Sequence, residues 1–240
     1  MSSKVISYHL EESILTITIN DNKRNVVSPN MLLQLNAALD YAQKQNAVVI
    51  LTGYKDVFSA GFDLKILKSG VRDALSMISG GFKLSARLLA FPTPVIIACN
   101  GHAMAMGAFI LLSADYRIGA EGNYNITTNE VAIGLTVPKA GIEICRQRLT
   151  PANFTRATLL AEYYSPNNAV ESGFLDKVVP YEDVLNEAKK LALSYTKLDL
   201  KSHYKTKIRA RKKMLCSLKW GIFTDRISFI ILGFNRMIGK

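Results

Sequence analysis

The sequence has no apolar run long enough to cross a bilayer. Its longest largely apolar stretches are Pro94–Cys99 and Ser228–Phe234, whereas a transmembrane helix needs about 20 such residues. The opening residues, Met-Ser-Ser-Lys-Val-Ile-Ser-Tyr-His, lack the apolar segment of a secretory signal. We therefore expect no membrane span and a cytoplasmic location.

Cysteine is scarce. Cys99, Cys145 and Cys216 are odd in number and have no metal-like spacing, which argues against a disulfide scaffold and against a metal site. We expect three reduced, mostly buried thiols and no metal. The sequence also contains no internal repeat and no low-complexity tract, so neither a solenoid nor a disordered region is indicated.

Acidic residues are almost missing from the C-terminal end. Residues 201–240 contain eleven Lys and Arg but only one acid, Asp225, and so hold nearly all of the net charge of +11. Such a segment favours an anionic partner, which could be ligand phosphates, nucleic acid or a membrane surface, or it forms a solvated helix face. Because aromatic and basic residues do not alternate, and no nucleic-acid motif is present, we expect no nucleic-acid partner.

Alternation between strand and helix patterns predicts an α/β fold with a helical C-terminal region that begins near Leu198. Short β-branched runs predict strands, and apolar residues at helical spacing predict helices. The predicted strands are Ile14–Asn20, Ala47–Thr52, Pro94–Asn100, Asp115–Ala120 and Phe174–Val179; the predicted helices are Pro29–Tyr41, Val71–Leu89, Ala140–Tyr163 and Tyr181–Tyr195.

Two loops rich in small residues follow two of the predicted strands. The first is Phe58–Leu64, and the second, Asn100–Ala108, opens a helix. Small residues allow the backbone to approach a ligand, and free N–H groups at a helix start favour negative charge. The two loops could therefore direct one N–H each at a single oxygen atom.

A single carboxylate, Glu130, lies in an almost uncharged segment that runs from Asp115 to Leu135. Burial there would raise its pKa toward the range that suits proton transfer at neutral pH. The alternative is an ordinary helix start, with Asn129 as the cap and Glu130 in the first turn.

Together these segments resemble the enoyl-CoA hydratase/isomerase family, also called the crotonase superfamily. Arg24–Ser28 is similar to the early turn of that family, Phe58–Leu64 to its first oxyanion loop, and Pro94–Gly107 to its second. The resemblance implies a spiral of strand–strand–helix turns, here residues 1–197, and a C-terminal trimerisation region, residues 198–240. It also implies an acyl-CoA substrate, with coenzyme A as part of that substrate and no separate cofactor.

The resemblance assigns roles to individual residues. The backbone N–H groups of Phe62 and Met106 would hold the thioester oxygen, and Glu130 would act as acid and base. The implied acyl-CoA contacts are Ala60, Asp63, Leu64, Lys65, Gly107 and Phe109.

Departures from the family pattern narrow the chemistry. Hydratases of the family hold water between two glutamates, and the position of the first is Phe109 here. Glu130 alone is similar to the single-glutamate Δ3,Δ2-enoyl-CoA isomerases. Met104 and Met106 replace glycines of the commonest second loop, which bears on pocket width. The expected function is an enoyl-CoA isomerase or hydratase of fatty-acid metabolism, with a non-catalytic acyl-CoA-binding protein as the alternative.

Four further expectations concern assembly, neighbouring side chains and the type of active site. Apolar residues in Ile227–Phe234 favour a trimer or a dimer of trimers. His102 is expected to fix the second loop, with catalysis by its imidazole as the alternative. Asp115 is expected to fix the start of a strand. No His–Asp set accompanies Ser59 or Ser113, so a hydrolase triad is not supported.

Overall fold

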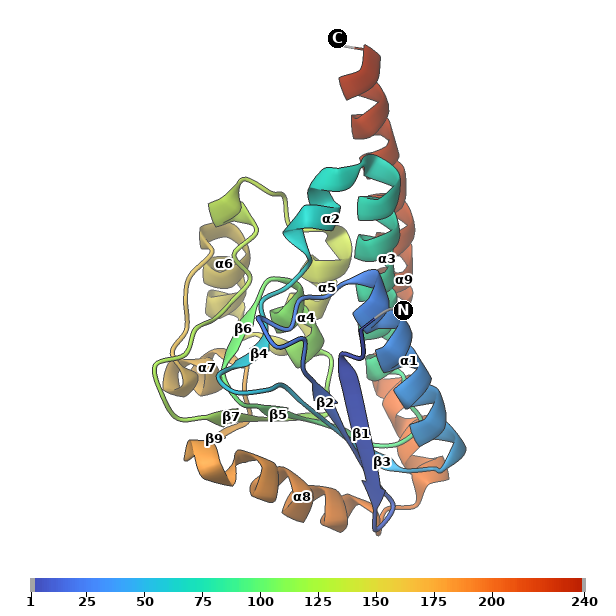
Figure 1. Cartoon of the computed structure of the whole chain (residues 1–240), viewed down its shortest axis with the longest axis vertical. Helices are drawn as coiled ribbons and strands as arrows, with labels where there is room; N and C mark the ends of the chain where they lie inside the picture. Colours follow the sequence, from blue (N-terminus) through green and yellow to red (C-terminus); the bar gives the residue numbers. More distant parts are fainter. Residues whose placement is uncertain (1–2, 239–240) are drawn as a thin grey trace.

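The computed structural model describes the backbone of residues 3–238 and the side chains of residues 3–227. Its elements are arranged as shown in Figure 1. The strands are β1 (Ile6–Glu11), β2 (Ile14–Ile19), β3 (Val48–Thr52), β4 (Val57–Ser59), β5 (Val95–Cys99), β6 (His102–Met104), β7 (Tyr116–Ala120), β8 (Ile126–Thr127) and β9 (Lys177–Val179). The helices are α1 (Pro29–Lys44), α2 (Leu64–Ser69), α3 (Val71–Leu89), α4 (Met106–Leu112), α5 (Lys139–Arg148), α6 (Pro151–Leu160), α7 (Pro166–Ser172), α8 (Val184–Tyr195) and α9 (Leu200–Ile238), with short 3₁₀ helices η1 (Val131–Ile133) and η2 (Tyr181–Asp183).

The larger sheet has the order β1-β2-β3-β5-β7-β9, antiparallel between β1 and β2 and parallel elsewhere. Every residue of β3 and β5 is buried, as expected for parallel strands that are covered on both faces. Helix α8 covers one face, where Val184, Ala188 and Ala192 meet the sheet, and the other helices lie on the opposite side (Figure 1).

The smaller sheet consists of β4, β6 and β8, all parallel. Each of its strands directly follows a strand of the larger sheet, since β4 follows β3, β6 follows β5 and β8 follows β7. The chain therefore winds as repeated strand–strand–helix turns, and the predicted α/β spiral is confirmed.

Helix α9 extends across α3 and α5 and continues past the body of the molecule (Figure 1). It begins at Leu200, close to the predicted boundary at residue 198. Gly221 lies so close to α5 that a Cβ atom there would be 2.9 Å from the backbone nitrogen of Ala140. In the described part of the chain no helix is long and apolar enough to cross a membrane.

Several local predictions are confirmed and others need correction. Ser28 caps α1 by accepting a hydrogen bond from the Met31 N–H at 3.2 Å, and α3 has the predicted bounds. The single helix predicted over Ala140–Tyr163 is wrong, because α5 and α6 are separated at Leu149–Thr150 and Pro151 begins the second. Two of the three cysteines are buried, whereas Cys216 is exposed; all three are free.

Candidate functional site

The three strands of the smaller sheet deliver three loops to one edge. Residues 60–63 follow β4, Ala105 follows β6, and residues 128–130 follow β8. Because the strands are parallel, their carboxyl ends lie at the same edge of the sheet, where α/β proteins commonly bind ligands. The fold thereby brings together the two small-residue loops and the Glu130 segment.

The first loop is held by its own backbone. The Ala60 N–H donates to the carbonyl of Arg24 at 3.0 Å. Val27 pairs with Phe62 as an isolated parallel bridge, in which the Val27 N–H donates to Gly61 and the Asp63 N–H donates to Val27. This pairing leaves the N–H of Phe62 without an acceptor among the described residues.

Beyond this loop the chain enters α2 at the surface. The Asp63 carboxylate caps that helix by accepting from the Lys65 N–H at 2.9 Å. The side chains of Leu64 and Lys65 are exposed, and Ala60 is partly exposed. All four residues assigned to the coenzyme A path thus offer accessible surface, and Asp63 also has a structural role as the cap of α2.

The second loop turns through Ala105, whose φ of +49° is unusual for a residue with a Cβ atom. The Ala105 N–H donates to the Thr127 carbonyl at 2.9 Å, and the Ala105 carbonyl accepts from Ala108 and Phe109. Met106 is the first residue of α4. The N–H groups of a first helical turn have no partner within the helix, and the N–H of Met106, a fully buried residue, has no acceptor among the described residues.

The two loops touch at Gly61. A Cβ atom there would lie 2.8 Å from the Ala105 Cβ, 3.0 Å from the Met104 oxygen and 3.3 Å from the Met106 nitrogen. The φ of Gly61 is +92°, which also favours glycine. Only glycine allows this approach, and it sets the backbones that carry the Phe62 and Met106 N–H groups side by side.

Glu130 lies in the turn before η1 and is only 7% exposed. Its Oε2 atom is buried and has no hydrogen-bond partner among the described residues. Burial raises the pKa of Glu130 to about 7. The nearby thiol of Cys145 also has a raised pKa, chiefly through its own burial and then through the charge of Glu130.

Glu130 does stand at the start of the short 3₁₀ helix η1, but the capping part of the helix-start explanation is wrong. Neither Asn129 nor Glu130 caps η1 through its side chain, and the Asn129 Oδ1 atom is also buried without a partner. The Glu130 carbonyl instead accepts from Ile133 and Leu135 and closes the turn. An unpartnered buried carboxyl is costly, and such groups concentrate at functional sites.

Phe109 and Gly107 are fully buried in α4. The centroid of the Phe109 ring lies 5.5 Å from that of the Phe82 ring. Gly141 of α5 packs directly on the Phe109 ring, because a Cβ atom at Gly141 would lie 2.8 Å from that ring. Gly107 packs on the Ser59 carbonyl in the same way. Phe109 therefore belongs to the core in this structure, and its contact with a substrate stays a prediction.

His102 fixes a loop, as expected. Its Nδ1 atom accepts from the Asn125 N–H at 3.0 Å, and its ring stacks edge-to-face on Tyr124. Asn100 has a similar role, because its side chain accepts from the Gly53 N–H at 2.8 Å and donates to the Lys55 carbonyl. These contacts favour the structural explanation of His102 over catalysis.

Comparison with known proteins identifies the family. The family model described as enoyl-CoA hydratase/isomerase matches residues 9–225. The chain belongs to the enoyl-CoA hydratase/isomerase family. This result confirms the resemblance drawn from the loops and from Glu130.

The relatives of this protein include one described as an isomerase and one described as a dehydratase. An enoyl-CoA hydratase/isomerase family protein from Pseudomonas syringae is 44% identical, with a TM-score of 0.91 over 92% of this chain and 96% of that one. A Mycobacterium tuberculosis protein described as an enoyl-CoA isomerase is 42% identical, with a TM-score of 0.89 over 92% and 97%. A carnitinyl-CoA dehydratase from Salmonella enteritidis is 28% identical over 78% of this chain and 73% of its own length.

The basic C-terminal helix of this family member is anchored in the core. Lys207 donates to the Asp115 carboxylate at 2.6 Å and to the carbonyls of Phe91 and Thr93 at 2.9 and 3.0 Å. Arg211 pairs with the other oxygen of Asp115 at 2.9 Å. These two cations are neutralised inside the protein, so at these positions the expectation of charges that face an anionic ligand is wrong.

Asp115 does fix a strand start, as predicted, although the strand is β5. Its Oδ2 atom accepts from the Val95 N–H at 2.8 Å. A second ion pair, between buried Arg117 and Asp176 at the surface, has a length of 2.7 Å and holds the chain that leads into β9. Both pairs lie away from the loop edge and act on the scaffold.

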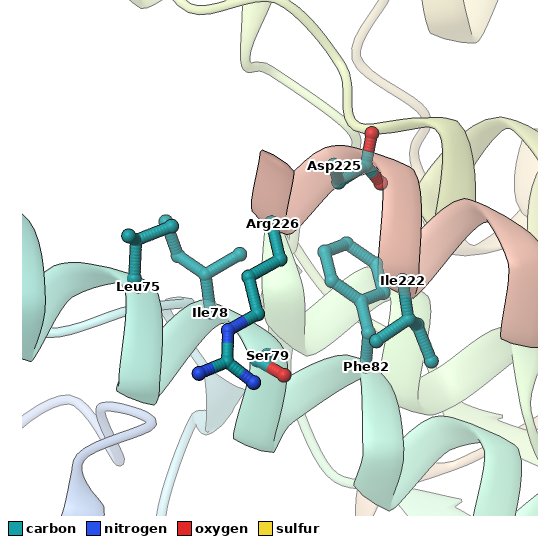
Figure 2. Close-up of a pocket in the computed structure, with 7 residues that line it drawn as sticks. All are labelled: Leu75, Ile78, Ser79, Phe82, Ile222, Asp225 and Arg226. Carbon is teal, nitrogen blue, oxygen red and sulfur yellow. The ribbon is translucent and has the colours of Figure 1, made fainter. Parts of the chain in front are cut away.

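A narrow crevice separates α3 from α9 beside the site (Figure 2). Phe82, one of its walls, lies 6.4 Å from the Phe62 ring, centre to centre, in an edge-on arrangement. The crevice has a volume of 10 Å³, room for about one water molecule. Its lining residues are Leu75, Ile78, Ser79, Phe82, Ile222, Asp225 and Arg226.

Sequence reasoning missed the residues that hold the site together. Asn25 has a φ of +52°, its carbonyl accepts from the Ser59 hydroxyl at 2.7 Å, and its amide donates to Val57. Asp225 accepts from the N–H groups of Lys139 and Ala140 at 3.0 Å, which caps α5. Asp225 is the single acidic residue of a basic segment, and this feature of the sequence could have indicated that it has a structural role.

Proposed function

We propose that this family member isomerises 3-enoyl-CoA to 2-enoyl-CoA, with Glu130 as its sole acid and base. The N–H groups of Phe62 and Met106 would donate to the thioester oxygen. Glu130 would take a proton from C2, the carbon beside the thioester, and the electrons of that C–H bond would form a dienolate whose negative charge lies on the thioester oxygen. Glu130 would then return the proton to C4, where the C3=C4 electron pair forms the new C–H bond while the dienolate electrons form the C2=C3 double bond.

The observation that carries this proposal is the state of Glu130. A base works best when its pKa is near the working pH, and burial raises the pKa of Glu130 to about 7. Its Oε2 atom has no partner among the described residues, so a substrate carbon could approach it without displacing a hydrogen bond.

Hydration requires a positioned water molecule and a second proton-transfer group. The position that holds the first glutamate in hydratases is Phe109, whose ring is buried against Phe82. An aromatic ring can neither bind nor activate water there. A 1,3-proton shift needs only one carboxylate, which favours isomerisation.

Isomerisation also requires groups that stabilise the negative charge that develops on the thioester oxygen. Contact of the loops at Gly61 supports a pair of backbone donors fixed before the substrate arrives. Removing one such donor costs on the order of 3 kcal/mol in enzymes that stabilise an oxyanion. We also propose Ala60, Asp63, Leu64 and Lys65 as contacts of the coenzyme A portion, and Gly107 and Phe109 as contacts near the acyl group.

Hydration remains the second candidate, because one relative is described as a carnitinyl-CoA dehydratase. The test is incubation of the protein with matched 2-enoyl- and 3-enoyl-CoA thioesters, with products identified by mass and absorbance. Isomerisation predicts 2-enoyl-CoA from the 3-enoyl substrate, with little 3-hydroxyacyl-CoA. Binding of both thioesters without turnover would indicate a non-catalytic acyl-CoA-binding protein.

A further inference from the structure

The crevice between α3 and α9 is built from one face of each helix. Residues three or four positions apart share a helix face, and both sets of lining residues have this spacing. They are Leu75, Ile78, Ser79 and Phe82 on α3, and Ile222, Asp225 and Arg226 on α9. The crevice therefore extends along α3 from Phe82 to Leu75, a length of about 10 Å at the rise of an α-helix.

The inner end of the crevice meets the site of the proposed reaction at Phe82. Its ring lies 6.4 Å from the Phe62 ring and 5.5 Å from the Phe109 ring, centroid to centroid. A Cβ atom at the preceding residue, Gly81, would lie 2.7 Å from the Phe62 ring and 3.1 Å from the Met106 sulfur. An acyl chain whose thioester is held by the N–H groups of Phe62 and Met106 can therefore leave the site past Phe82.

The walls of the crevice suit a hydrocarbon chain. Its larger side chains, those of Leu75, Ile78, Phe82 and Ile222, are apolar. The free volume is 10 Å³, so a chain enters only when wall side chains change rotamer. Leu75, Ile78 and Ile222 are partly exposed, and such side chains exchange rotamers rapidly. The crevice can therefore widen from its solvent side.

Arg226 is the one cation of the lining. Figure 2 shows its side chain extending from α9 toward α3, with the guanidinium group near Ser79. Arg226 is exposed and makes no side-chain hydrogen bond or ion pair with the residues that the structure describes. The segment Ile227–Phe234, on which the trimer prediction is based, lies outside the described side chains except for Ile227, and no acid follows Asp225 in the sequence.

The neighbouring acid does not neutralise Arg226. The Asp225 carboxylate accepts from the N–H groups of Lys139 and Ala140, each at 3.0 Å, at the start of α5. The N-terminus of a helix carries partial positive charge, which offsets the charge of this carboxylate. The outer end of an otherwise apolar crevice therefore has a positive charge whose partner is not Asp225.

We propose that Arg226 selects acyl-CoA substrates whose acyl chain ends in a carboxylate. The apolar part of the chain would lie against the crevice walls. The terminal carboxylate would accept hydrogen bonds from the guanidinium group, which matches a carboxylate with two parallel N–H donors, and from the Ser79 hydroxyl beside it. This inference names the substrate class of the proposed isomerase and rests on that function.

Chain length is part of the proposal. The carboxylate must pass Phe82 and then about 10 Å of α3 before it reaches the guanidinium group. A short chain leaves its carboxylate among apolar walls, where a charge is unfavourable. The preference for a carboxylate should therefore appear only above a threshold length, and a short chain should instead prefer a methyl end.

The experiment measures the binding of saturated acyl-CoA thioesters, which cannot be isomerised, by calorimetry. Chains of equal length end in a methyl group, a carboxylate or a quaternary ammonium group, and the series is repeated at several lengths. Above the threshold length, we expect the wild type to bind the carboxylate chain roughly three- to fivefold more tightly than the methyl chain, as for an exposed ion pair, and the ammonium chain most weakly. Equal affinity for all three ends at every length would overturn the proposal.

Three variants test whether Arg226 is the residue responsible. Arg226→Met should abolish the preference for a carboxylate and keep the affinity for the methyl chain, and Arg226→Glu should reverse the preference toward the ammonium chain. Arg209→Met is the matched control, because Arg209 is exposed on the same helix and does not line the crevice. It should keep the wild-type ratio of affinities. An unchanged ratio in Arg226→Met, or an equal loss in Arg209→Met, would refute the proposal.

Turnover separates this inference from the proposed function. If the protein prefers the carboxylate chain but does not isomerise any 3-enoyl-CoA, the proposed function is wrong and the role of Arg226 stands. If it isomerises 3-enoyl-CoA with the same kcat/KM for all three chain ends, the proposed function stands and the role of Arg226 is wrong. A protein that binds none of the saturated thioesters would overturn both.

Discussion

At the scale of single residues, Glu130 is a carboxyl group whose burial disfavours its charged form. Its pKa is about 7 in the folded chain, compared with 4.5 for an unperturbed glutamate. The folded state therefore holds its proton more tightly than the unfolded state does. Stability from this group is complete below pH 4.5 and is lost as the pH rises through about 7.

Glu130→Gln should therefore gain stability relative to the wild type as the pH rises. The amide cannot ionise, so between pH 5 and pH 8 the difference in unfolding free energy should move by about 3 kcal/mol in favour of the variant. Urea unfolding at both pH values measures it. Glu162→Gln, a change at an exposed carboxylate, is the control, and a pH-independent difference would show that Glu130 is not buried in this way.

Gly61→Ala tests the contact between the two loops. The new Cβ would meet the Ala105 Cβ at 2.8 Å and impose strain at a φ of +92°, which should separate the Phe62 and Met106 donors. We expect turnover of enoyl-CoA to fall at least about tenfold, as for a partly lost oxyanion donor. Gly70→Ala also changes a glycine of positive φ, +159°, but its Cβ meets nothing within 4 Å, so it should leave turnover unchanged; equal losses in both variants would contradict the explanation.

At the scale of elements, the attachment of α9 depends on Lys207. Its ammonium group is buried and bridges Asp115 to the carbonyls of Phe91 and Thr93. Lys207→Ala would remove the donor to these two carbonyls and leave Asp115 with Arg211 as its one cationic partner among the described residues, and breaking a buried ion pair costs about 3–5 kcal/mol. Urea unfolding should show this loss, whereas Lys205→Ala, an exposed change on the same helix, should have almost no effect. If the two variants unfold at similar urea concentrations, Lys207 is not the residue that attaches α9 to the core.

Sequence patterns predicted long elements better than short ones. Helix α3 has 19 residues and strong periodicity, and its predicted bounds are those observed. The strands β4, β6 and β8 have two or three residues each, too few for any period to be recognised. β1 was also missed, because most of its side chains are exposed and polar residues interrupt it.

The site residues likewise divide into those that could be predicted from local sequence and those whose roles depend on contacts between distant segments. Glu130 and the two loops stood out because their composition is unusual over a few residues. The pairing of Val27 with Phe62, and of Asp115 with Lys207 ninety-two residues later, depends on the finished fold. Asn129 was misjudged as a cap for the same reason, since only the turn that Glu130 closes shows where its side chain lies.

At the scale of the whole molecule, the chain has a net charge of +11, and most of the Lys and Arg side chains that the structure describes are exposed, although Lys207 and Arg211 are paired. Exposed cations attract the phosphates of coenzyme A, and salt screens that attraction, since the Debye length falls from about 10 Å at 0.1 M to about 3 Å at 1 M. Acyl-CoA affinity should therefore fall as salt rises. Acyl-CoA affinity that does not change with salt would show that these cations do not contribute to binding. Duplex DNA that competes with acyl-CoA would support a nucleic-acid-binding function.

The central claim is that one buried carboxyl group moves the proton. The most direct measurement is the rate of 3-enoyl-CoA isomerisation by the wild type and by Glu130→Gln across pH 5 to 9. The account predicts a wild-type rate that rises with pH through about 7, as Glu130 loses its proton, and a loss of at least about 10²-fold in the variant. Near-full activity in Glu130→Gln, or wild-type hydration as fast as isomerisation, would contradict it.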